Sequence, residues 1–202
     1  MDNVYHSSPI QGLSEISAQS EGTHGNHWIY AAYNKVISGL FLAKPYTSEF
    51  ICAKRMRDGK VILTERFAGA FDLSYANKQG AIYVLPAASF DHGITDFTGE
   101  CVTTKSVKPL SEIAIDDVKA YLLDLQTQGE LVIHYYPERE ADIPADDEDL
   151  VIDTAVWAQA YGDSAVEKLA QYHPHLKDAA VRAIEDNTYG DVKAVGLIRA
   201  FD

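Results

Sequence analysis

Two short segments near the start of the chain carry the residues best suited to chemistry. His6 ends a strand-like run over residues 4–6, which a Ser-Ser-Pro sequence terminates. Tyr30 lies in a second strand-like run over residues 28–32, which leads into an apolar, helix-like stretch at residues 36–42. An imidazole at the end of one strand and a phenol at the end of the next form an arrangement that can hold a nucleotide.

The pairing resembles the first two motifs of the ADP-ribosyltransferase fold, which includes the poly-ADP-ribose polymerase catalytic domain and the RNA 2′-phosphotransferases. His6 matches the first motif, whose imidazole donates to a ribose hydroxyl. Tyr30 matches the second, where the polymerase branch has an Ile-Tyr-Phe-Ala type segment and this chain has Ile-Tyr-Ala-Ala. The resemblance spans roughly residues 4–110. It implies a split β-sheet domain that uses NAD as a co-substrate.

Further contacts to NAD follow from the same resemblance. Ser7 stands where the family usually has Gly, beside the nicotinamide amide, and its Cβ crowds the close backbone approach that Gly permits. Phe41 occupies the position of a second aromatic, so Tyr30 and Phe41 would flank the nicotinamide ring, with Tyr33 as a second candidate for stacking. From the residues alone, Phe41 reads equally well as a core aromatic on a short apolar helix.

Cleavage of a nicotinamide–ribose bond leaves positive charge on the sugar, so the site needs a nearby carboxylate. Glu100 opens a strand-like run late in the resembling region, and the resemblance implies that it fills this role. An ordinary exposed Glu at a strand start explains it equally well, and Asp91 and Asp96 are the reserve candidates. The expected catalytic residues are therefore His6, Tyr30 and Glu100, and the expected NAD contacts are His6, Ser7, Tyr30, Tyr33 and Phe41.

Other constellations of reactive residues are weaker. His24 and His27 are not at the helical spacing of zinc proteases and have no evident third ligand, so we expect no metal. Cys52 and Cys101 show no zinc spacing and are expected to be buried strand thiols. Sequence patterns for a Rossmann dinucleotide site, a P-loop or a nucleophile elbow do not occur.

Composition limits the partners. The 202 residues carry a net charge of −13, which argues against a protein held on nucleic acid or an anionic membrane by phosphate neutralisation. The sequence has no run of 18 apolar residues and no signal-peptide pattern at its start, so we expect a cytoplasmic protein that does not span a membrane. The expected partners are a nucleotide and an acceptor that the sequence does not identify.

The hydrophobic pattern predicts an α+β protein in three parts. The resemblance implies that residues 1–137 form an ADP-ribosyltransferase-like domain. An exposed acidic linker is expected over 138–150 and a helical extension over 151–202, in which Ser164 and Glu167 form a capping box. Strands are expected at 4–6, 28–32, 50–56, 60–67, 81–85, 100–106 and 131–135, and helices at 35–43 and 118–126. Asn34 is expected to cap the first helix, and Asp58-Gly59 to form the turn of a hairpin between the third and fourth strands. The basic residues Lys54, Arg55, Arg57, Lys60 and Arg66 are expected on the solvated face and tip of a hairpin.

The sequence leaves more than one function open. The first is NAD-dependent ADP-ribosyl transfer, or a related NAD-consuming glycosyl transfer, in a cleft of the β domain. The second is a catalytically silent nucleotide- or protein-binding module that retains the fold, which the Ser at position 7 favours. A third is an interaction protein that acts through its helical tail.

Overall fold

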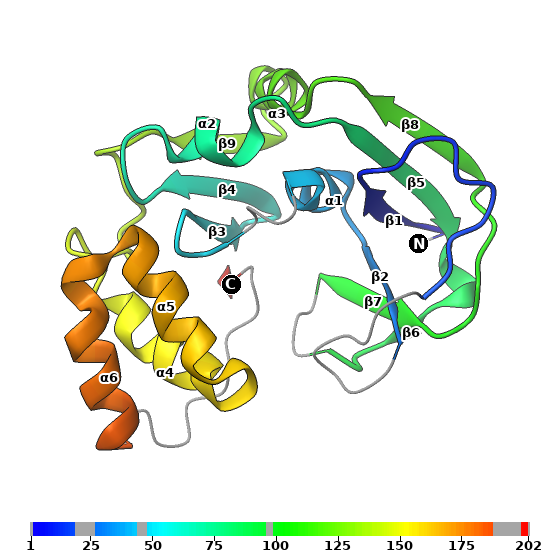
Figure 1. The fold of residues 1–202 in the computed structure, drawn as a ribbon. Helices are drawn as coiled ribbons and strands as arrows, with labels where there is room; N and C mark the ends of the chain where they lie inside the picture. The colour runs from blue at the N-terminus through cyan, green and yellow to red at the C-terminus, as the bar shows by residue number, and fades with distance from the viewer. Residues whose placement is uncertain (1, 19–26, 44–47, 96–98, 188–198, 202) are drawn as a thin grey trace.

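The fold combines two β-sheets with helices, which confirms the α+β class (Figure 1). The computed structural model describes residues 2–18, 27–43, 48–95, 99–187 and 199–201. No helix within these ranges is long and apolar enough to cross a membrane.

The first sheet has six strands, and all of its neighbouring strands are antiparallel. In spatial order they are β6 (Asp91–His92), β7 (Glu100–Thr103), β2 (Ile29–Ala32), β1 (Asn3–Ser8), β5 (Gly80–Pro86) and β8 (Ser111–Ile115). The sequence predicted strands at β1, β2, β5 and β7, but not at β6 or β8. The last of these is a largely exposed edge strand that lacks a strong apolar alternation.

This sheet divides in the middle. Strands β1 and β2 pair through a single register match, Tyr5 with Ala32. By contrast β1 follows β5 from Asn3 to Ser8, and β2 follows β7 along its whole length. The strands β8-β5-β1 and β2-β7-β6 therefore form two halves that turn away from each other beyond that pair (Figure 1).

The second sheet has four strands in the order β10 (Arg199–Phe201), β3 (Cys52–Arg57), β4 (Lys60–Glu65) and β9 (Leu131–His134). The predicted hairpin of β3 and β4 is confirmed, with Asp58 and Gly59 both at positive φ in the turn (49° and 74°). Such a turn matches the right-handed twist of the strands that it joins. The outer strands β10 and β9 run parallel to β3 and β4.

The helices fall into two groups: α1 (Lys35–Leu40), α2 (Ala70–Tyr75) and α3 (Val118–Thr127) lie against the sheets, while α4 (Asp149–Tyr161), α5 (Asp163–Tyr172) and α6 (Lys177–Glu185) form a separate bundle (Figure 1). The predicted cap Asn34 is confirmed, because its side chain accepts from the Val36 N–H at 2.7 Å. The predicted capping box is wrong. Helix α5 begins at Asp163 after Gly162, so Ser164 lies inside it.

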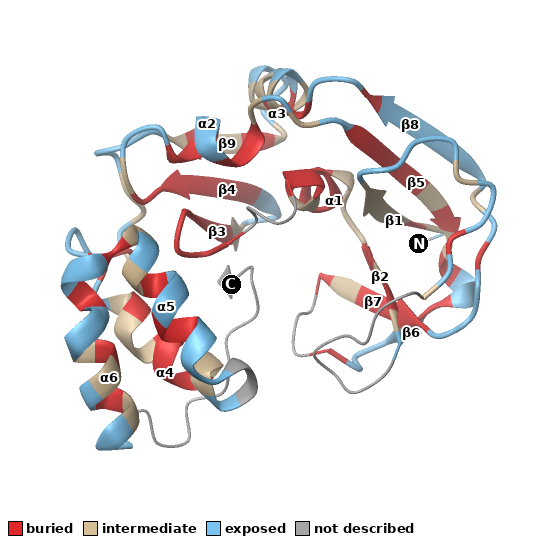
Figure 2. Cartoon of the chain, in the orientation of Figure 1, coloured by how far each residue is buried: buried red, intermediate tan, exposed pale blue. Residues whose placement is uncertain are grey.

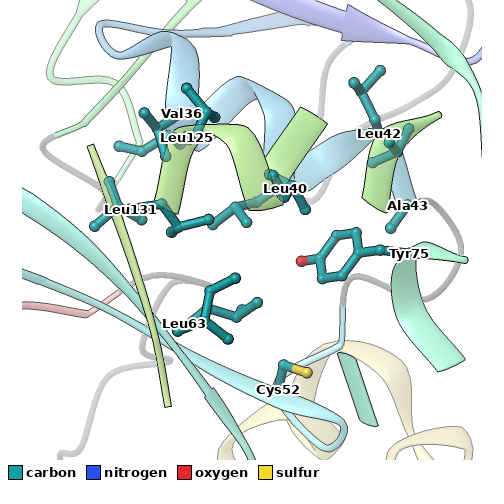
Figure 3. Close-up of a cluster of buried hydrophobic side chains, with 14 of the residues drawn as sticks. Val36, Leu40, Leu42, Ala43, Cys52, Leu63, Tyr75, Leu125 and Leu131 are labelled. Carbon is teal, nitrogen blue, oxygen red and sulfur yellow. The ribbon is translucent and has the colours of Figure 1, made fainter. Parts of the chain in front are cut away.

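Three clusters of buried side chains hold these elements together (Figure 2). The largest lies between the second sheet and helices α1 and α3, with Leu40, Leu63, Tyr75, Leu125 and Leu131 among its members (Figure 3). A second cluster lies on the face of the first sheet that points away from the largest cluster. A third joins Phe50 to the C-terminal helices. The first cluster packs residues from both sheets into one core, which fixes β1 and β2 against the second sheet.

Three of the five basic residues that were predicted on the solvated face of the hairpin are buried, which corrects the prediction for them. Lys54, Arg55 and Arg66 are at most 1% exposed, and only Lys60 is exposed as expected at the tip. Burial lowers the pKa of Lys54. Charges can be buried at this depth only when they are paired and hydrogen-bonded.

The partners of these cations come largely from the acidic segment. Arg55 Nε donates to Asp142 at 2.7 Å, and Arg66 bonds to Asp147 at 2.9 Å and to Asp149 at 2.8 Å. Buried Glu49 accepts from both arginines. Residues 138–148 lack regular structure, as predicted, but the carboxylates of Asp142 and Asp147 pair with the buried arginines instead of lying free in water. The division of the chain into three parts stays a prediction.

Removing Arg66 should strongly destabilise the protein. We expect Arg66→Ala to lower the free energy of unfolding by about 3–5 kcal/mol, because Glu49, Asp147 and Asp149 each lose one of their charged partners in a buried cluster. Lys60→Ala, at the exposed hairpin tip, is the control and should change it by less than about 0.5 kcal/mol. Urea denaturation measures both, and equal effects of the two changes would contradict the role of the buried cluster.

Acid should loosen the contact between the bundle and the second sheet. Buried His173 donates from Nε2 to the Phe50 carbonyl at 2.6 Å, and burial lowers the pKa of His173 below its ordinary 6.5, although this bond and Asp147 raise it in part. The unfolded chain therefore binds a proton that the folded chain does not, and stability falls as pH drops below about 6.5.

The free energy of unfolding should fall by at most about 1.4 kcal/mol per pH unit in this window. Urea denaturation between pH 7.5 and 5 measures it, and His173→Gln should flatten the dependence in that window. A slope unchanged by this substitution would assign the effect to another group.

Candidate functional site

Three residues expected to carry chemistry lie on three adjacent strands of the first sheet. His6 is on β1, Tyr30 is on β2 and Glu100 opens β7. The strand order β7-β2-β1 puts β2 in the middle, and Glu100 lies directly opposite Ala32. All three side chains are half-buried. The fold thus gathers residues that are far apart in the sequence at the division between the two halves of the sheet.

The register decides which side chains share a face. Paired residues of antiparallel strands project to the same side, and the side alternates along each strand. Tyr30 and Glu100 therefore share the face of Ala32. Tyr5 pairs with Ala32, so its neighbour His6 belongs to the opposite face. The imidazole reaches β2 through the backbone of Tyr30, at the gap where β1 and β2 separate.

One hydrogen bond spans that gap. His6 Nδ1 lies 2.8 Å from the Tyr30 carbonyl oxygen. Because a carbonyl only accepts, Nδ1 carries the hydrogen, and in the neutral ring Nε2 is then an acceptor. A ribose hydroxyl at this site would donate to Nε2 of neutral His6, whereas the resemblance implies an imidazole that donates.

Tyr33 continues the chain beyond β2, toward the start of β7. Its backbone N–H donates to the Gly99 carbonyl at 3.1 Å, which holds it beside Glu100. Its ring stacks on His92 with centroids 5.5 Å apart, and its hydroxyl hydrogen-bonds to His92 Nδ1. This ring therefore already has a protein side chain against it.

Cys101, next to Glu100, is unsuited to act as a nucleophile. Burial and then the negative charge of Glu100 raise the pKa of the Cys101 thiol to about 12, although a hydrogen bond with Tyr33 lowers it in part. Nucleophilic attack needs the thiolate, which is scarce at neutral pH with such a pKa. Cys101 and Cys52 are both free and buried in strands, as predicted.

The remaining expected NAD contacts are placed less favourably. Phe41 begins the short 3₁₀ helix Phe41–Ala43 and packs against the largest buried cluster, as the core reading of this residue predicted. Ser7 is half-buried on β1, paired with buried Ile82. The structure thus places His6, Tyr30 and Glu100 on three adjacent strands, with His6 on the opposite face from the other two, and it packs part of the Phe41 ring into the core.

The residues that the sequence offered as weaker candidates for the site lie in different places. His24 and Asp96 lie outside the described residues, and His27 is exposed. Asp91 is exposed on β6, one strand away from Glu100. Within the described ranges no group of three or more His, Cys, Asp or Glu side chains could hold a metal ion. The contact of His92 with Tyr33 was missed, because a two-residue strand leaves no periodic signal in the sequence.

Comparisons of the chain with protein-family models, with curated proteins and with solved structures found no match.

The bond from His6 to Tyr30 should help to hold the two halves of the sheet together. We expect His6→Leu to lower the free energy of unfolding by about 1–3 kcal/mol, because the half-buried carbonyl loses its donor. His6→Asn should lose less, since its amide N–H₂ lies close to the position of Nδ1. Thermal and urea unfolding compare the variants, and equal losses for both would show that this hydrogen bond contributes little.

Proposed function

We propose that this protein binds NAD where the first sheet divides and cleaves the nicotinamide–ribose bond, passing ADP-ribose to an acceptor. The finer fold assignment, an ADP-ribosyltransferase-like split β-fold, is part of the same proposal. In it His6 Nε2 meets a ribose hydroxyl, Tyr30 stacks on the nicotinamide ring and Glu100 lies near the sugar carbon that loses nicotinamide.

One observation carries the proposal. The resemblance asks for a His on a first strand, a Tyr on a second strand that turns into a helix, and a Glu on a later strand. Here the later strand β7 pairs with β2. Glu100 lies opposite Ala32, which is two residues from Tyr30 and on the same face. Helix α1 follows β2 directly, and its cap Asn34 is in place. Nothing in the spacing of the motifs alone required this juxtaposition.

The chemistry suits a half-buried carboxylate. As the bond between C1′ and nicotinamide breaks, the electron pair leaves with the ring, which becomes neutral without needing a proton. Positive charge develops on the ribose, and a fixed carboxylate lowers the energy of that state more when water is partly excluded. Val102, fully buried beside Tyr30 and Glu100 on the same face, provides an apolar surround for both.

A second candidate is a module that binds a nucleotide without cleaving it. Two observations favour it: Phe41 packs against the core, which leaves the ring clamp incomplete, and Ser7 carries a Cβ where close backbone approach is needed. This module would use the same division of the sheet, so the two candidates differ in turnover and not in the place of binding.

Calorimetry with NAD and an assay of nicotinamide release together test the proposal. We expect the wild type to bind NAD and release nicotinamide, and Glu100→Gln to bind within about threefold of the wild type but turn over at least about 100-fold more slowly, as when one stabilising group is removed. Glu167→Gln, on the exposed side of α5, is the matched control.

Binding without release by the wild type would favour the silent module. No detectable binding would reject both candidates. Equal turnover by Glu100→Gln and the wild type would reject the role of Glu100 while leaving NAD cleavage in place.

A further inference from the structure

A second carboxylate lies on the same face as Glu100. In the hairpin of β6 and β7, Asp91 pairs with Val102 and His92 pairs with Cys101. Val102 shares the face of Tyr30, its partner on β2. The alternation therefore puts Asp91, Tyr30 and Glu100 on one face. His92 falls on the other face with Cys101, and its stacking on Tyr33 agrees with this assignment.

The register also sets the spacing of the two carboxylates. Glu100 and Val102 are two residues apart on β7, so Asp91 and Glu100 are diagonal neighbours, separated by roughly 7–8 Å at the backbone. In glycoside hydrolases, carboxyl groups about 6.5–9.5 Å apart leave room for a water molecule that attacks the sugar carbon from the side opposite the leaving group. A backbone separation of this order is compatible with two carboxyl groups that act in different roles.

The environments of Asp91 and Glu100 also suit two different roles. Glu100 is half-buried at the start of β7, whereas Asp91 is exposed on the edge strand β6. A group that stabilises charge on the sugar benefits from partial exclusion of water, and a group that removes a proton from an incoming molecule needs access to solvent. His92 lies on the opposite face and is bonded to Tyr33, so it is not placed for the second task.

We propose that Asp91 is the general base for the attacking nucleophile, and that the acceptor supplies an O–H group, with water as the simplest case. This inference rests on the proposed function. The oxygen of the nucleophile bonds to C1′, the bond from C1′ to the nicotinamide nitrogen breaks, and neutral nicotinamide leaves with the electron pair. Asp91 takes the proton and releases it to solvent. With water the products are ADP-ribose, nicotinamide and one proton.

Azide separates the two roles, because it is a strong nucleophile that has no proton to lose. We expect Asp91→Ala to bind NAD like the wild type but to hydrolyse it about 100-fold to 10,000-fold more slowly, as for loss of a general base. Added sodium azide should restore nicotinamide release by this variant and yield azido-ADP-ribose, detected by mass spectrometry. Glu100→Ala should be slowed as well but not rescued, because it lacks charge stabilisation.

Asp58→Asn, in the exposed turn of the β3–β4 hairpin in the second sheet, is the control and should behave like the wild type without azide. Turnover by the wild type that Asp91→Ala leaves unchanged would overturn the inference and leave the proposed function standing. A slowed Asp91→Ala that azide does not rescue would overturn it too, since Asp91 would then act on the sugar or on binding. Absence of turnover in the wild type would overturn the proposed function and this inference with it.

Discussion

The pairing of buried Arg55 and Arg66 with Glu49 and the acidic segment is the interaction on which the architecture depends. These side chains tie the β3–β4 hairpin to residues 138–149 and thereby to the start of helix α4. An apolar contact of similar size would hold these parts together without fixing their orientation. Charged groups that lose water must find particular partners, so this cluster permits few alternative arrangements of the bundle against the second sheet.

The division of the first sheet depends in turn on what surrounds it. A sheet joined in its middle by one residue pair has little backbone hydrogen bonding across that line. The largest buried cluster compensates, because it packs Ala32 of β2 and Ile82 of β5 together with residues of the second sheet. The halves are thus held from one side by the core, while their edges stay separated at His6 and Tyr30. A site placed there gains backbone groups that an unbroken sheet would use for itself.

Much of the fold was predictable where local chemistry is strong. The Asp58-Gly59 turn, the Asn34 cap and the apolar run of β5 each have a local physical cause, and each was predicted. Strand β8 and helix α2 were not, because an exposed edge strand and a six-residue helix have little periodicity. The buried arginines were misread since their aspartate partners lie 81–87 residues away, in a segment whose composition is typical of a solvated loop. The candidate site was predictable in part. His6, Tyr30 and Glu100 were named from motifs, but the position of Asp91 beside them follows only from strand order and register.

Strand β10 has a consequence for how molecules of this protein meet one another. It runs parallel to β3 and occupies the outer edge of the second sheet. A bare strand edge is a template on which another chain can add itself, and such contacts lead to aggregates. Residues 199–201 therefore cover the edge of β3. Residues 199–201 are synthesised after the β3–β4 hairpin, so the edge of β3 is open to neighbouring chains until they are made.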